Sequence, residues 1–180
     1  MRSAAFLLAC WGMLGASTAH AESVRSATTA VTRLSGLYRY TGDATEQAAR
    51  VEAIDSGIES LFFAIRPIAR SRAASATVIA ETCRISLEGE LVRVKVPDRP
   101  DYVSPLDGRE ARFVYKDDES TLTHRMKGGT LIEHFDQEGE GRINEYSLGE
   151  DNETMRVKVT LYSPKLTRPI VYTLTYRRVR

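Results

Sequence analysis

The sequence predicts a mainly β fold, an up-and-down antiparallel β-barrel of about eight to ten strands with a helix pair inserted between the first and second strands. Three observations support this prediction. From residue 81 onward, apolar and polar residues alternate with period two between turn signals about 10 residues apart. Residues 43–65 instead show the three- and four-residue spacing of helices. The hairpin turns also give the strands one consistent apolar face, and closing such a meander into a barrel removes its two unpaired edges.

Residues 1–21 have the form of an export signal. Arg2 supplies a positive start, residues 4–16 are apolar and uncharged, and Ala19-His20-Ala21 is a small-x-small cleavage site. We therefore expect cleavage after Ala21 and a periplasmic or secreted protein. A second interpretation stays open, because the segment that ends at Cys10 resembles a bacterial lipobox and would make the chain a lipoprotein anchored at that cysteine. No later segment reaches the length of a membrane span without charges, so no integral membrane span is expected.

Charge and cysteine content exclude several classes of protein. Lys and Arg total 25 against 24 Asp and Glu, and without residues 1–21 the two totals are equal at 24. A chain without basic excess is not expected to bind nucleic acid. A hydrophobic fraction of 42% with this charge balance argues against a disordered chain. Cys83 is the one cysteine after residue 21, which excludes an intramolecular disulfide and leaves a buried apolar thiol or a reactive one.

A single domain is expected over residues 34–180, after a flexible lead-in at 22–33 that is rich in Ser, Thr and Ala. A first strand is expected at 36–41. Asp43 and Glu46 then have the spacing of a helix capping box, and the apolar residues that follow share one helix face. The Ser56-Gly57 break allows two short helices or one bent helix, and Pro67 is expected to end or kink the second. This helix pair either packs on the sheet or, with its nearby arginines, contacts a membrane surface.

Eight further strands are expected in the period-two region, together with a long loop at 97–108 that includes a short edge strand near Tyr102. The expected strands are 81–87, 91–96, 110–116, 121–126, 130–137, 142–148, 154–162 and 169–178.

The hairpin turns predict which side chains face inward. The Gly128-Gly129 turn places His124 opposite Glu133, and the loop around Gly139 places Glu133 opposite Tyr146. The turn at 117–120 places Phe113 opposite His124 in the same way. The inward face is then mostly apolar, and its polar exceptions are the candidates for chemistry.

The element order, one strand, a helix pair and then a long meander, resembles the calycin superfamily, and within it the fatty-acid-binding proteins and lipocalins. Gly36-Leu37-Tyr38 is similar to the Gly-x-Trp of lipocalins, and Tyr176-Arg177-Arg178 is similar to their terminal basic strand. The resemblance implies a lipid-binding barrel. The Arg-x-Tyr motif with which fatty-acid-binding proteins hold a carboxylate is not carried over, because Leu174 stands where its Arg would be.

We expect a non-enzymatic binding protein that holds a small hydrophobic or lipid-like ligand inside the barrel, without cofactor or metal. A cross-strand row of His124, Glu133 and Tyr146 would orient the ligand's polar group, since a buried Glu requires partners. The other candidate ligand-binding residues are aromatic or lie in phase with that row: Phe113, Tyr115, Phe135, Met126, Tyr172, Tyr176 and Arg178.

Several alternatives remain open from the sequence. The row could be a satisfied buried network without a ligand, and the His124–Glu133 pair is the one candidate for catalysis. Arg178 could cap Tyr38 and not point into the barrel. The whole protein could instead be a structural or interaction protein of the cell envelope, with a side-chain-filled barrel and transient envelope contacts.

Overall fold

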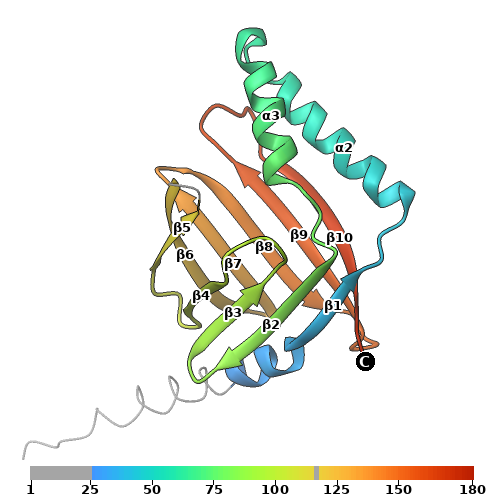
Figure 1. Cartoon of the computed structure of the whole chain (residues 1–180), viewed down its shortest axis with the longest axis vertical. Helices are drawn as coiled ribbons and strands as arrows, with labels where there is room; N and C mark the ends of the chain where they lie inside the picture. The colour runs from blue at the N-terminus through green and yellow to red at the C-terminus, as the bar shows by residue number, and fades with distance from the viewer. Residues whose placement is uncertain (1–25, 116–117) are drawn as a thin grey trace, which may run out of the picture.

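The computed structural model describes residues 26–115 and 118–180, so the expected export signal and Cys10 lie outside the described residues. Ten strands form one antiparallel sheet that curls into a barrel, with helices α2 and α3 at one end (Figure 1). Strand β1 (Gly36–Tyr40) lies between β2 (Thr82–Glu88) and β10 (Ile170–Arg178), which brings the two ends of the β region together. The mainly β up-and-down fold with an inserted helix pair is confirmed.

The remaining strands follow the chain order around the barrel. They are β3 (Leu91–Lys95), β4 (Tyr102–Pro105), β5 (Ala111–Tyr115), β6 (Asp118–Lys127), β7 (Thr130–Gln137), β8 (Glu140–Leu148) and β9 (Thr154–Tyr162). Strands β4 and β5 are the two edges of the sheet, so the barrel is nearly closed and has one gap in its backbone hydrogen bonding. Within the described residues, no helix is long and apolar enough to cross a membrane.

The first helix of the pair begins directly after Asp43, the predicted capping residue. Asp43 is the N-cap of α2 (Ala44–Glu59), and its carboxylate accepts from the Glu46 backbone N–H at 2.8 Å. The Glu46 side chain does not complete the capping box, because its carboxylate accepts from the Thr175 N–H of β10. Gly57 does not break the helix. It lies against Ile170 of β10, and the absence of a side chain there allows α2 to approach the barrel closely.

The second helix differs from the sequence expectation. A short 3₁₀ turn (Phe63–Ile65) follows α2, and Pro67 lies in the first turn of α3 (Arg66–Ala76). The first turn of a helix has no intrahelical use for backbone N–H groups, so a proline fits there without cost. The prediction that Pro67 ends or kinks the second helix is therefore wrong.

The expected flexible lead-in also requires correction in its described part. Residues 26–34 form a helix, drawn in blue at the end of the barrel opposite α2 and α3 (Figure 1). Its Val31 and Leu34 are fully buried, and the Tyr38 hydroxyl donates to the Leu34 carbonyl at 2.8 Å. This N-terminal helix closes one end of the barrel, so the folded domain begins before residue 34.

Two of the predicted strand registers are shifted, each by an even number of residues. Strand β7 turns into β8 through Glu138 and Gly139 alone, both at positive φ, which is a tighter turn than expected. Glu133 consequently faces Asn144, and Tyr146 faces Leu131. Strand β5 likewise continues to a Tyr115–Asp118 pair, which places Phe113 opposite Ser120 and not His124. Even shifts preserve the inward face.

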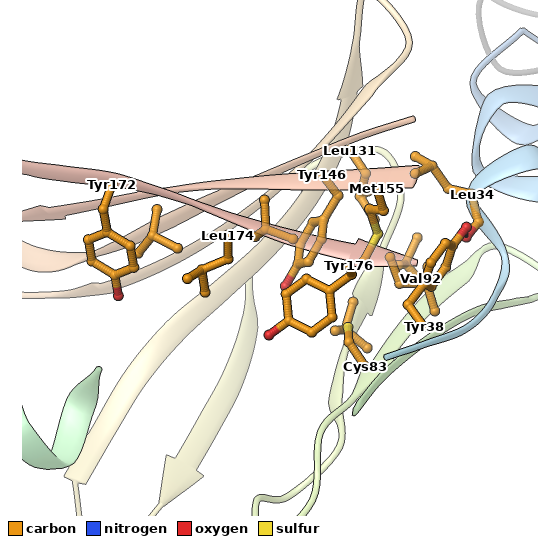
Figure 2. Close-up of a cluster of buried hydrophobic side chains, with 14 of the residues drawn as sticks. Leu34, Tyr38, Cys83, Val92, Leu131, Tyr146, Met155, Tyr172, Leu174 and Tyr176 are labelled. Carbon is orange, nitrogen blue, oxygen red and sulfur yellow. Dashed lines mark hydrogen bonds between the residues drawn. The ribbon is translucent and has the colours of Figure 1, made fainter. Parts of the chain in front are cut away.

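The other registers match the prediction. His124 pairs with Glu133 across β6 and β7, and Tyr146 pairs with Val157 across β8 and β9. The inward side chains form one hydrophobic core that runs along the barrel, with Leu34 and Tyr38 toward one end and Tyr172 toward the other (Figure 2). Tyr146, Tyr176 and Cys83 lie between these ends.

Candidate functional site

A chain of buried polar side chains crosses the inside of the barrel. The Ser104 hydroxyl of β4 lies 2.7 Å from His124 Nδ1 of β6, and His124 Nε2 lies 3.0 Å from Glu133 Oε2 of β7. All three residues are at most 1% exposed. With Nε2–H donating to the carboxylate, Nδ1 accepts from the serine hydroxyl, so a neutral imidazole satisfies both neighbours.

Strand β8 completes the network on the far side of Glu133. Glu133 Oε1 accepts from the Tyr146 hydroxyl at 2.8 Å and from the Asn144 amide at 2.6 Å. Asn144 Oδ1 in turn accepts from Arg142 Nε at 2.6 Å. Each carboxylate oxygen of Glu133 therefore has at least one donor, which offsets the cost of burying its charge. His124, Glu133 and Tyr146 are brought together, although Tyr146 reaches Glu133 diagonally from its position opposite Leu131.

This network also spans the gap between the two edge strands. Ser104 lies on the edge strand β4, whereas His124 lies on β6, one strand in from the other edge. A single backbone bridge between Asp107 and Arg125 joins the same two sides. Side-chain hydrogen bonding thus takes the place of a β4–β5 ladder.

We call this junction between the two edges of the sheet the seam. Aromatic side chains extend the seam toward the end of the barrel where α2 and α3 lie. The rings of Tyr102 on β4, Phe113 on β5 and Phe135 on β7 meet edge to face, with centroids 4.9–5.3 Å apart. The Arg99 guanidinium lies 4.8 Å from the centroid of the Tyr115 ring. Three predicted ligand residues, Phe113, Tyr115 and Phe135, therefore have seam contacts.

A cavity of about 90 Å³ lies inside the barrel beside this network. Its wall is part polar and part apolar and comes from β2, β4, β8, β9 and β10, together with the segments that precede β2 and follow β3. The lining residues are Val78, Ala80, Cys83, Val96, Pro97, Arg99, Tyr102, Arg142, Asn144, Tyr146, Val157, Leu174 and Tyr176. Of the predicted ligand residues, Tyr146 and Tyr176 line this cavity.

Burial and two charged side chains, Glu133 and Arg142, set the electrostatics of the cavity. Burial raises the pKa of Tyr146 well above its usual value and also raises the pKa of Tyr102 and Tyr176, so the three phenols are neutral donors. The negative charge of Glu133 adds to the increase in pKa at Tyr146 and Tyr102, whereas the positive charge of Arg142 opposes the increase at all three phenols. Burial likewise raises the pKa of the Cys83 thiol, which agrees with a small buried apolar residue and not with a reactive thiol.

The remaining predicted ligand residues lie elsewhere in the barrel. Met126 packs against the core, and Tyr172 is buried at the end of the hydrophobic cluster that is farther from Leu34 and Tyr38 (Figure 2). Arg178 is not among the cavity-lining residues. Its guanidinium lies 4.8 Å from the centroid of the Tyr38 ring and donates to the Ser35 and Arg33 carbonyls beside the N-terminal helix. Arg178 therefore caps Tyr38, the alternative that the sequence left open.

Four polar residues of the site were not among the predicted ligand residues: Arg99, Ser104, Arg142 and Asn144. Arg142 and Asn144 alternate in phase with Tyr146, so the period-two pattern contains the signal that Arg142 points inward. Ser104 carries no such signal, because it lies in a proline-rich segment that the sequence predicts to be mostly loop. Among the residues that the structure describes, no group of three His, Cys, Asp or Glu side chains is placed to hold a metal ion.

Solved structures are similar to this barrel in fold, although not in sequence. A secretory abundant heat soluble protein from Ramazzottius varieornatus matches 82% of this chain and 96% of its own, with 13% identity and a TM-score of 0.53. The chain has a calycin-like β-barrel fold. No protein-family model matches the sequence, and a search of curated proteins found no match.

Two further structures match the calycin-like barrel to the same degree. A Schistosoma mansoni fatty acid binding protein in complex with arachidonic acid is 11% identical over 84% of this chain and 99% of its own, with a TM-score of 0.52. The fluorescent protein UnaG is 13% identical over 83% and 99%, also with a TM-score of 0.52. At these identities the likeness establishes the fold, and the ligand has to be argued from the cavity.

Proposed function

We propose that this protein is an exported, non-enzymatic binding protein that holds a small hydrophobic or lipid-like molecule inside its barrel. The observation that carries the proposal is the internal cavity, which combines apolar walls with convergent polar groups from Arg142, Asn144 and Tyr146. Ligand sites commonly combine apolar walls with a few placed polar groups. A fatty acid binding protein with arachidonic acid has the same barrel fold, which supports a ligand in this position.

The state of the His124–Glu133 pair favours binding over catalysis. Both side chains are fully buried, and neither is among the residues that line the cavity. A general acid or base has to reach a substrate atom directly or through one water. The pair instead orients Asn144 and Tyr146, which do line the cavity.

The proposed location rests on the first 21 residues. Their positive start, apolar run and Ala19-His20-Ala21 site support export to the periplasm or the medium, and a lipid anchor at Cys10 is the alternative. N-terminal sequencing and intact mass of the protein purified from its own host distinguish the two. A mature chain that begins at Glu22 supports cleavage, whereas a lipidated chain that begins at Cys10 contradicts it.

A second candidate function is an envelope structural or interaction protein without a ligand. The small cavity volume favours it, because a ligand site of ordinary size has about 300–1,000 Å³. The connection between α2 and α3 offers a contact surface for such a partner. Phe62 and Phe63 are 67% and 70% exposed there, with ring centroids 4.6 Å apart.

Native mass spectrometry of the protein isolated from its host, followed by solvent extraction, tests the proposed function. We expect a bound small molecule in the wild type and in Ala48→Phe, which enlarges an exposed residue of α2. We expect its loss in Ala80→Phe, which fills the cavity from its lining. A wild-type protein that carries no small molecule and co-purifies with a protein partner would favour the second candidate.

A further inference from the structure

A stripe of basic side chains crosses the outside of the barrel, away from the cavity. It has one exposed residue on each of five adjacent strands, β3, β2, β1, β10 and β9 (Figure 1), and these residues are Lys95, Arg84, Arg39, Arg177 and Arg156. We propose that this basic stripe binds an acidic polysaccharide that carries a carboxylate on each sugar. The inference goes beyond the proposed function, because it concerns the outer wall of the barrel and not its interior.

The strand registers make the basic stripe continuous. Lys95 lies directly opposite Arg84, and Arg39 lies directly opposite Arg177. Arg84 and Arg39 are diagonal neighbours, because Arg84 pairs with the residue two positions before Arg39. Arg177 and Arg156 are diagonal neighbours in the same way. The Cβ atoms of directly opposite residues are about 5 Å apart and those of diagonal neighbours about 7–8 Å, so the stripe is about 25 Å long.

The protein balances the charge of the basic stripe only in part. Arg177 forms an ion pair with Glu153, and Lys95 forms one with Asp101 at 3.6 Å. The other three side chains have no ion pair with any carboxylate that the structure describes. Like charges directly opposite each other destabilise a sheet, and a bound anion removes that repulsion. Four of the five residues are arginines, whose guanidinium groups donate two parallel hydrogen bonds to a carboxylate.

Hydroxyl side chains flank the basic stripe. Its outward neighbours on the five strands include Thr82, Ser86, Thr154 and Thr175, and none of these neighbours is acidic or aromatic. Hydroxyl groups both donate and accept hydrogen bonds, which suits the hydroxyl groups of a sugar. Proteins that bind single-stranded nucleic acid commonly stack its bases on aromatic side chains, and the stripe offers no such ring.

The position of the basic stripe argues against an acidic peptide and against a membrane surface. Each of the five strands has a paired neighbour on both sides, so none of them can accept a peptide as an additional strand. The stripe also crosses five of the ten strands of a curled sheet, so its two ends face different directions. A flat bilayer cannot contact all five side chains at once, whereas a flexible saccharide chain can follow the curvature.

Calorimetric titration of the purified protein tests the proposal. The probes are an alginate hexasaccharide, with one carboxylate on each sugar, and maltohexaose, a neutral chain of equal length. We expect the alginate hexasaccharide to bind at least tenfold more tightly than maltohexaose, hexaglutamate or an oligothymidylate. We also expect its affinity to fall at least tenfold between about 0.05 M and about 0.5 M NaCl, because salt screens exposed charges.

Variants locate the bound saccharide. The double variant Arg39→Gln and Arg84→Gln removes two unpaired charges from the basic stripe and should weaken alginate binding at least tenfold. The matched control is Arg125→Gln with Lys127→Gln, which removes the same charge from two exposed positions on β6, across the barrel, and should leave the affinity unchanged. Circular dichroism checks the fold of each variant. If the stripe variant does not fold, Arg39→Gln alone should weaken binding at least threefold.

Several outcomes would overturn the inference. They are equal affinities for alginate and maltohexaose, tighter binding of hexaglutamate or oligothymidylate, and unchanged alginate affinity in the folded stripe variants. A control variant that weakens binding as much as the stripe variant also overturns it. Binding to phosphatidylglycerol vesicles without binding to alginate would assign the stripe to a membrane surface instead. Each of these results leaves the proposed function standing, because the extracted molecule and Ala80→Phe test the cavity alone.

Discussion

The Ser104 hydroxyl and the His124 Nδ1 atom meet at 2.7 Å across the gap between the two edge strands of the barrel. This contact joins β4 to β6 where no continuous backbone ladder does so. It also connects the gap to the cavity, since His124 contacts Glu133 and Glu133 contacts Asn144 and Tyr146. The polar residues that the sequence singles out therefore hold the wall together as well as shaping the site.

Removing the serine hydroxyl tests this role. Ser104→Ala leaves the His124 ring nitrogen buried without its partner, and we expect a loss of about 1–3 kcal/mol in the free energy of unfolding. Ser147→Ala is the matched control, because its hydroxyl makes one long, exposed contact and should change stability by less than about 0.5 kcal/mol. Urea denaturation measures both. Equal effects would show that the seam contact contributes nothing to stability.

Glu133 should be far more sensitive to substitution than Glu145 on the next strand. Glu133→Ala leaves buried donors from three residues without an acceptor, and we expect a loss of at least about 3 kcal/mol. Glu145→Ala removes a partly exposed ion pair with Lys158 and should cost less than about 1 kcal/mol.

Glu133→Gln separates shape from charge at the same position. The amide oxygen can replace Oε1, and its NH₂ group can donate to His124 Nε2 if Nδ1–H then donates to Ser104. We therefore expect Glu133→Gln to lie between the wild type and Glu133→Ala in chemical denaturation. A Gln variant as unstable as the Ala variant would show that the charge itself is required.

Gly57 should tolerate no side chain while Ile170 is present. A Cβ atom at residue 57 would lie 2.3 Å from Ile170 Cγ1, so Gly57→Ala should cost about 1–3 kcal/mol in spite of the better helix propensity of Ala. In an Ile170→Ala background the same change should cost less or stabilise α2. A double-mutant cycle by thermal unfolding measures the coupling, and independent effects would contradict the contact.

Asp151 gives a pH prediction with a defined sign. Hydrogen bonds from the Thr154 hydroxyl, the Thr154 backbone N–H and the Glu153 backbone N–H lower the pKa of Asp151 to about 2. A carboxyl group whose pKa is lower in the folded state than in the unfolded state stabilises the folded state. This contribution is present in full at pH values above the unfolded-state pKa, near 3.8, and is lost as the pH falls toward 2. Carboxyl NMR titration should give this value, and Thr154→Val should raise it. An unperturbed pKa would contradict the turn geometry.

The β part of the fold could be predicted because its turns carry explicit signals. Gly128-Gly129 fixes the β6–β7 register, and both residues have positive φ as a two-residue turn requires. The β7–β8 turn hides the same geometry behind Glu138, which adopts a φ of 53° although it is not a glycine. The sequence favours a longer loop at this turn. The prediction therefore placed the side chains on the correct face of the sheet but shifted the β7–β8 register by two residues.

The site could be predicted only in part, because some of its residues lie on regular strands and others lie in an irregular segment. His124, Glu133 and Tyr146 lie on regular strands, where parity alone decides that they point inward. Arg99 lies in the loop after β3 and Ser104 lies on the short strand β4. The path of both segments depends on contacts with β5 and β6, which lie later in the sequence. The N-terminal helix has no clear periodicity, because only Val31 and Leu34 among its residues are fully buried.

The pairing of β1 with β10 has a consequence for how the molecule is made. Strand β1 pairs with β10, which lies more than 120 residues later in the sequence. Arg178 of β10 also donates hydrogen bonds to the carbonyls of Arg33 and Ser35, just before β1. Contacts between such distant positions form slowly. During synthesis, the backbone pairing between β1 and β10 therefore cannot form until residues 170–178 have left the ribosome.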